Sequence, residues 1–317
     1  MSEKTKKEKA MAFSKKYGIV LMLVILLVAA AILEPMFLQP RNLTNVVRQI
    51  AVNGIIAVGM TFVIISGNID LSVGSIFCFC GMSIMFLMPI VGWLPAILIG
   101  ILLGAVIGVI NGYMIYRGMP AFIMTLAVSI ILRGLANMVS NGTPIRSVSE
   151  TYNAIGQNYF LGIPIQVYVY ILIALAATFV MIRTKFGRSV YAVGGNKEVA
   201  RLSGINVRKI IIAVYIISGV LAAIAAIIGT ARLGSCEPTL GQDYHSDAIA
   251  ATVIGGAAMT GGYGNQLMTV VGVLLLGVLN NILNLLGVSP YWQYLFKGGI
   301  IILAVASDVF RRVKVKK

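Results

Sequence analysis

The feature that most constrains the fold is a series of long apolar runs that begins near residue 18 and continues to residue 307. An α-helix needs about 20 largely apolar residues to cross a bilayer. Ten runs approach this length: 18–33, 43–65, 71–88, 94–116, 120–140, 165–182, 210–231, 247–259, 266–286 and 291–307. The eighth is short, which favours a broken or re-entrant piece. The sequence therefore predicts an all-α integral membrane protein, one domain over 1–317, with about ten transmembrane helices.

The placement of charge predicts the orientation of the chain. Its net charge is +15, and most of the 25 Lys and Arg lie in 4–16, 183–209 and 311–317, at the ends of apolar runs. Basic residues concentrate in the cytoplasmic loops of membrane proteins, whereas a nucleic-acid-binding domain carries them along a folded soluble face. We therefore expect the N-terminus (1–16), the 183–209 loop and the tail (308–317) in the cytoplasm, and no nucleic-acid partner.

Several function classes find little support in the residues. The chain has no GxxxxGK[ST] phosphate loop, so ATP hydrolysis would belong to a partner. We also see no metal-ligand cluster, nucleophile elbow or paired carboxylates, and expect no metal, no cofactor and no enzymatic activity. An ion-coupled secondary transporter stays open as the alternative, although such proteins carry acidic or histidine relays inside their helices. The basic residues Arg133 and Lys297 lie deeper within their apolar runs than the other Lys and Arg. Each is still close enough to the outer interface for its charged group to extend to it.

A polar, glycine-containing segment, 66–75, interrupts two apolar runs. A carboxylate at bilayer depth is costly, so Asp70 should be paired, solvated or near an interface. In one interpretation Asp70 caps the third helix through the amides of Ser72 and Val73. In the other, the break lines a water-filled path, in which Asn68, Asp70 and Ser72 face the solute.

Amide side chains within the helices have the same two interpretations. Asn280 and Asn284 lie four residues apart and share one helix face, and Asn111 occupies a comparable run earlier in the chain. Such amides either hydrogen-bond across helices or line the path of a hydroxyl-rich solute. The small residues from Asp247 to Gly264 likewise predict a tight helix interface with a glycine turn, or a discontinuous element at the centre of a transporter.

Glycines recur every four residues along the fourth run, at Gly100, Gly104, Gly108 and Gly112. Small residues let two membrane helices approach closely, so this face predicts a helix contact. In the 183–209 loop, Glu198 to Ser203 has helical composition, with Asn196 as N-cap and Gly204 as the C-terminal stop. This short helix is either a plain surface helix or a rigid knob that fits a groove on a partner.

Together these segments resemble the permease subunits of bacterial ABC sugar importers, in the ribose, galactose, xylose and autoinducer-2 group and closest to its ribose-like branch. The resemblance extends from about residue 17 to residue 308. The residues that carry it are Gly59-Met60-Thr61 with Asn68 to Ser75, Asn141 to Pro144, Gly194-Gly195-Asn196 with Arg201 to Val207, Asp247 to Ala251, and Asn280 with Leu285, Gly287 and Val288.

The resemblance implies a fold of the type II ABC importer class, in the inner (plasma) membrane of a bacterium. It implies a permease that translocates a ribose-like pentose or related monosaccharide, delivered by an extracytoplasmic sugar-binding protein. Its other partners would be an ATP-binding subunit, a second permease copy (usually identical) and membrane lipid. Glu198, Val199, Ala200 and Gly204 would couple the permease to the ATPase, and Val199 departs from the common Glu-Ala-Ala form. Asn68 stands where many such permeases have glycine, and Asn tolerates left-handed backbone better than most residues.

Overall fold

The computed structural model describes residues 3–315, and the side chains of 18–300, 302 and 306. The side chains of the predicted basic segments 1–16 and 308–317 therefore lie outside the described residues. The helices are α1 (Glu3–Leu33), a 3-10 turn (Pro35–Leu38), α2 (Pro40–Ile65), α3 (Val73–Val91), α4 (Trp93–Tyr116), α5 (Ala121–Ser140), α6 (Glu150–Gln157), α7 (Ile165–Arg183), α8 (Lys185–Gly195), α9 (Lys197–Leu202), α10 (Val207–Leu233), α11 (Tyr244–Ile254), α12 (Gln266–Leu285) and α13 (Pro290–Val315). The strands have two residues each: β1 (Ile145–Arg146), β2 (Tyr159–Phe160), β3 (Ile163–Pro164) and β4 (Ser235–Cys236).

The helical membrane class predicted from the sequence is confirmed. Within the described residues, seven helices are long and apolar enough to cross a membrane: α2, α3, α4, α5, α7, α10 and α12. The apolar part of α1, Gly18–Leu33, is shorter, and α11 has only 11 residues. The expected count of about ten spans is therefore not confirmed, although each of the ten apolar runs overlaps a helix.

Helix α2 forms the centre of the bundle. Its apolar window is 83% buried, against 28% for those of α4, α5 and α7. Helices α7, α10, α11 and α12 all pack against α2. The exposed apolar side chains of the outer helices suit a lipid surrounding, since lipid covers apolar surface that water would penalise.

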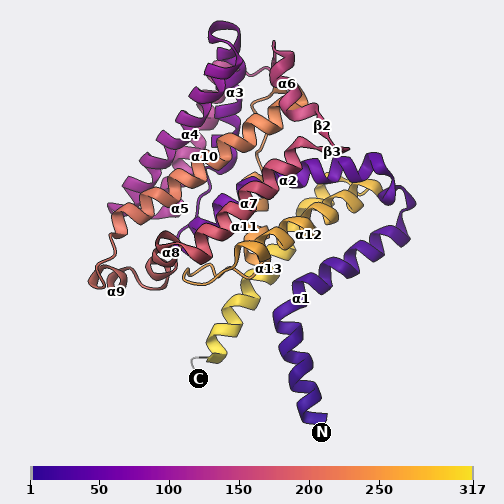
Figure 1. Cartoon of the computed structure of the whole chain (residues 1–317), viewed down its shortest axis with the longest axis vertical. Coiled ribbons are helices and arrows are strands. Elements are labelled where there is room, and N and C mark those ends of the chain that lie inside the picture. The colour runs from indigo at the N-terminus through magenta and orange to yellow at the C-terminus, as the bar shows by residue number, and fades with distance from the viewer. Residues whose placement is uncertain (1–2, 316–317) are drawn as a thin grey trace.

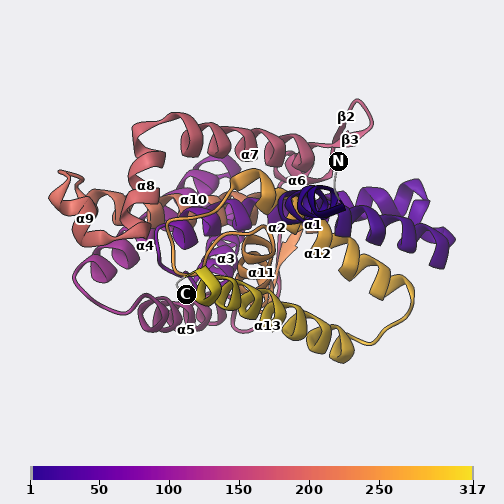
Figure 2. The ribbon, with the colours of Figure 1, turned by 90° about the horizontal axis from the view of Figure 1, so that it is seen from below.

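The short elements lie at opposite ends of the long helices. Helices α8 and α9 lie at one end, and α6 with the β2–β3 hairpin at the other (Figure 1), and a second view shows the same separation (Figure 2). We call these the inner and outer ends, after the predicted orientation. At the outer end, β1 pairs with β4, with Ile145 opposite Cys236. This pairing joins the loops 141–164 and 232–246.

The glycine face of α4 packs mainly on α10. All four glycines are buried. A Cβ at Gly104 would lie 2.5 Å from the carbonyl oxygen of Gly219, one at Gly108 would overlap the backbone of Tyr215, and one at Gly112 would lie 2.7 Å from Cα of Ile212. Gly100 instead faces the Ile84 side chain of α3. The backbones of α4 and α10 therefore lie too close together for any residue larger than glycine at positions 104, 108 and 112.

Candidate functional site

The chain leaves helical geometry between α2 and α3. Gly67 adopts a φ of +77°, in the left-handed region that a side chain disfavours, whereas Asn68 does not. The amide of Asn68 turns back instead, and its Nδ2 donates to the carbonyl and the hydroxyl oxygens of Ser66 at 3.2 and 3.0 Å. Its Oδ1 accepts a 3.5 Å bond from Lys197 Nζ. The break between α2 and α3 therefore contacts the start of α9 at the inner end.

Asp70 lies in a closed polar cluster just after this break. Its carboxyl is 1% exposed. Oδ1 accepts from the backbone N–H of Ser72 at 2.9 Å and from its hydroxyl at 2.5 Å, and Oδ2 accepts from the Ser218 hydroxyl at 2.9 Å. Asn111 Nδ2 donates to the Ser72 hydroxyl at 2.9 Å. These bonds tie the start of α3 to α4 and α10.

The six residues proposed for the path therefore divide into three places. Asp70, Ser72 and Asn111 share the closed cluster, in which Ser72 and Asn111 have no exposed surface. Asn68 lies at the inner end. Asn280 and Asn284 line a separate cavity at the outer end.

This outer cavity has a volume of about 440 Å³ and is bounded by α2, α3, α10, α11, α12, α13 and the loop before α11. Its size lies in the range of roughly 300–1,000 Å³ that is typical of small-molecule sites. The lining is rich in groups that both donate and accept hydrogen bonds, among them the amides of Gln49, Asn53, Asn280, Asn284 and Gln293. Such a lining suits a solute with many hydroxyl groups.

One ion pair borders the cavity. Lys297 Nζ lies 2.9 Å from Asp247 Oδ1, and the two side chains are 21% and 13% exposed. Arg133 is also used internally, since its Nη1 donates to the carbonyl oxygens of Pro238 and Leu240 at 2.5 and 3.1 Å. Each of the two bases therefore has an acceptor within the protein, Arg133 in the loop before α11 and Lys297 at Asp247 of α11.

The amides of α12 differ in their partners. Asn281 and Asn42 exchange two hydrogen bonds, of 2.8 and 3.0 Å, which fix α12 to the start of α2. Asn284 accepts a 2.9 Å bond from Gln293 at the cavity rim. The Oδ1 of Asn280 is buried and has no hydrogen-bond partner among the described residues. Asn280 shares this property with Gln266 at the other end of α12, but only Asn280 of the two lines the outer cavity.

The short helix predicted at the inner end is present as α9. The Asn196 side chain accepts bonds from the backbone N–H groups of Glu198 and Val199, and so caps its first turn. Gly204 ends it with a φ of +80°. Ala200 is 3% exposed, whereas Val199 and Leu202 are 58% and 79% exposed. Helix α9 therefore presents two apolar side chains to its surroundings from a firmly capped turn.

Glycines at the end of α8 and in the α11–α12 loop pack closely against the end of α2, next to α9. The N–H of Gly262 donates to the carbonyl oxygen of Ile65 at 2.8 Å, at the end of α2. Gly194 packs so closely on the same carbonyl group that a Cβ there would overlap it. Tyr191 donates to the carbonyl oxygen of Gly264 at 2.9 Å, and burial raises the pKa of this hydroxyl, which keeps it protonated as the donor. Helix α8, which leads into α9, is thus in direct contact with the C-terminal end of α2 and with the α11–α12 loop.

No group of three or more His, Cys, Asp or Glu that could hold a metal ion occurs among the described residues.

Comparisons with known proteins show what the chain is similar to. A family model described as the permease component of the branched-chain amino acid transport system matches residues 42–305. The ribose import permease protein RbsC of Bacillus subtilis is 44% identical over 302 residues, which cover 93% of this chain and 92% of that protein. RbsC of Escherichia coli K12 is 43% identical, covering 90% and 91%. The xylose transport system permease protein XylH of Haemophilus influenzae is 35% identical, covering 92% and 96%. No solved structure matches the chain.

Proposed function

The chain belongs to the family of permease components described for branched-chain amino acid transport systems, and from this premise we propose that it is the membrane-spanning permease of an ATP-driven sugar importer whose cargo is a ribose-like pentose. The relatives named above are permeases for ribose and xylose, and a further one, 38% identical, is named for D-allose. The observation that carries the proposal in the structure is the outer cavity, whose amides offer donors and acceptors to a polyhydroxylated solute.

We assign energy supply and delivery to partners. ATP hydrolysis takes place on a separate ATP-binding subunit that contacts α9 through Glu198, Val199 and Gly204. Ala200, which is buried, belongs to the same coupling segment by packing α9 against the rest of the permease. A sugar-binding protein outside the membrane delivers the pentose to the outer cavity. Two copies of the permease pair in the membrane as a homodimer. The exposed apolar pair Val199 and Leu202 supports the first assignment, because a capped helix with an apolar tip suits a groove on another protein.

The proposed topology has ten helices in the lipid of the bacterial inner membrane, in the arrangement of type II ABC importers. Besides the seven long spans, these would be α1, α11 and α13. Both termini and the 183–209 loop face the cytoplasm. The concentration of Lys and Arg at 183–209, which forms one end of the bundle, supports this orientation.

The test of the proposed cargo is recovery of the complete complex. The tagged permease is purified with its ATP-binding subunit, and the binding protein that stimulates the ATPase is then isolated. We expect the sugar released from that protein on denaturation to be a pentose. Release of a branched-chain amino acid would contradict the proposal.

A further inference from the structure

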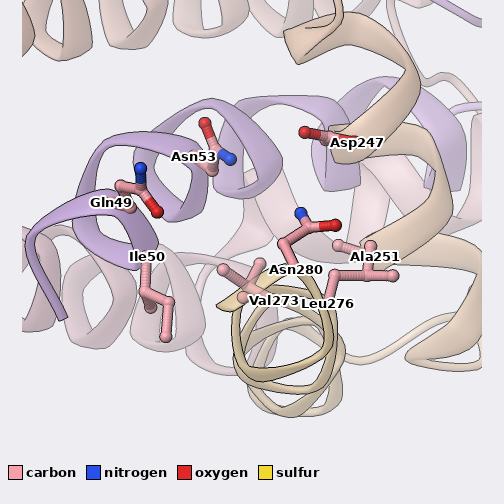
Figure 3. A pocket seen from close by; sticks show the side chains of 9 residues that line it. Gln49, Ile50, Asn53, Asp247, Ala251, Val273, Leu276 and Asn280 are labelled. Carbon is pink, nitrogen blue, oxygen red and sulfur yellow. The ribbon is translucent and has the colours of Figure 1, made fainter. Parts of the chain in front are cut away.

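A small recess adjoins the outer cavity between α2, α11 and α12. Its volume is about 30 Å³, which is room for a group the size of a water molecule. Four polar residues border both spaces: Gln49, Asn53, Asp247 and Asn280. Asn53, Asp247 and Asn280 come from three different helices and surround the recess (Figure 3). The recess is therefore a side pocket of the cavity, with a polar mouth.

Three amides at this mouth have hydrogen-bonding capacity that the protein does not use. Among the described residues, no side-chain hydrogen bond engages Gln49 or Asn53, and the buried Oδ1 of Asn280 has no partner. A buried acceptor without a partner costs about 1–3 kcal/mol. The fourth polar residue at the mouth, Asp247, forms an ion pair with Lys297 at 2.9 Å, which neutralises its charge. The mouth therefore favours a neutral group that donates and accepts hydrogen bonds.

The part of the recess lining that it does not share with the outer cavity is apolar. Ile50, Val273 and Leu276 line it together with Ala251 and Gly277. Farther toward the inner end, the same three helices are joined by threonines, with the Thr61 hydroxyl 3.0 Å from that of Thr269 and 3.4 Å from that of Thr252. A solute in the cavity can place one small group in the recess, and beyond the recess the threonine contacts hold the three helices together.

We propose that this recess binds a single hydroxyl or hydroxymethyl group of the transported sugar. The hydroxyl donates a hydrogen bond to Asn280 Oδ1, and the Gln49 and Asn53 amides lie at the mouth. The proposal rests on the proposed function, since it takes the solute in the cavity to be a sugar. An amide acceptor satisfies a hydroxyl donor, and the apolar part of the lining accommodates the attached carbon. A sugar that lacks this hydroxyl leaves Asn280 Oδ1 buried and unpaired.

The test compares the uptake of ribose and of its deoxy analogues by the wild-type permease and by variants at the recess. The permease is reconstituted with its ATP-binding subunit in proteoliposomes, with saturating loaded binding protein, and ATP-driven uptake is measured for D-ribose and its 2-, 3- and 5-deoxy analogues. Wild type should move one analogue about tenfold more slowly than ribose, the factor that one hydrogen bond of about 1.4 kcal/mol provides. Asn280→Leu should slow ribose to that rate and leave the analogue unchanged. Gln49→Leu provides the same comparison if Asn280→Leu does not accumulate in the membrane.

The matched control is Asn281→Leu, the same change at the next residue of α12. The Asn281 amide hydrogen-bonds with Asn42 and does not line the recess. Its uptake per folded protein should keep the preference for ribose over the analogue. The proposal is overturned if wild type moves ribose and every analogue equally. It is also overturned if Asn280→Leu keeps the preference, or slows every sugar by one factor. If wild type moves no pentose at all, the proposed function itself fails.

Discussion

The hydroxyl of Ser218 in α10 donates a 2.9 Å hydrogen bond to Asp70 Oδ2, which lies between α2 and α3. This bond joins two segments far apart in the sequence, and the Asp70 carboxyl accepts two further bonds from Ser72. The cluster is closed to solvent, so its first effect is on assembly of the bundle.

We predict that Asp70→Ala lowers stability more than Ser218→Ala does. The first change leaves two hydroxyl donors and one backbone donor without their acceptor, at a cost of about 3 kcal/mol, whereas the second loses one bond, about 1 kcal/mol. Thermal unfolding of the purified protein in detergent measures both. Uptake per folded protein should stay near the wild-type value in Ser218→Ala. A strong loss of uptake at wild-type stability would instead place Asp70 and Ser218 on the path of the sugar.

The contact between α4 and α10 gives the second prediction. Gly108→Leu should remove most of the assembled protein from the membrane, because its side chain would meet the backbone of Tyr215. Gly134→Leu is the matched control, since Gly134 is exposed on α5 and has open space around its Cβ position. Quantitative blotting of membranes compares the two. Equal amounts of Gly108→Leu and wild-type protein in the membrane would contradict the prediction. They would show that assembly does not require close contact between α4 and α10.

The third prediction concerns α9. Gly204→Val should abolish sugar uptake and sugar-stimulated ATP hydrolysis while the protein still inserts, because Val resists the left-handed φ that ends the helix. Glu198→Lys, which reverses the charge at the first turn of α9, should do the same.

Two variants serve as controls for α9. Gly204→Asn should retain part of the uptake, because Asn tolerates this conformation. Gly195→Ala should retain uptake, because its Cβ meets nothing within 4 Å. Wild-type uptake by Gly204→Val at equal abundance would mean that α9 is a passive surface.

Much of the fold could be predicted from the sequence, because membrane helices are encoded locally by apolar length. The short eighth run corresponds to α11, and the i+4 glycines correspond to the face of α4 that packs on α10. The short strands were missed, since two-residue pairings such as Ile145 with Cys236 depend on a partner far away in the chain.

The site was predicted less well. Asn111 and Asn280 looked alike in sequence, yet one belongs to the Asp70 cluster and the other to the outer cavity. Spacing along a helix says which residues share a face, but not which neighbouring helix that face meets. The pairing of Lys297 with Asp247 was missed for the same reason, because the two residues lie on different helices.

The fourth prediction concerns orientation. Single cysteines introduced in 141–160 should react with a membrane-impermeant thiol reagent in intact cells, and those in 190–200 should react only after lysis. The reason is that basic residues concentrate in the second region. The native cysteines Cys78, Cys80 and Cys236 are buried and give the background. Equal labelling of both regions in intact cells would contradict the proposed topology.

The central claim is ATP-driven import of a pentose through this chain. Its most direct measurement is accumulation of radiolabelled D-ribose in proteoliposomes that contain the permease with its ATP-binding subunit, supplied with the loaded binding protein and ATP. We predict uptake that requires ATP and the binding protein and that persists when proton and sodium gradients are dissipated. Uptake that needs no ATP and stops when those gradients are abolished would contradict the account and identify an ion-coupled secondary transporter.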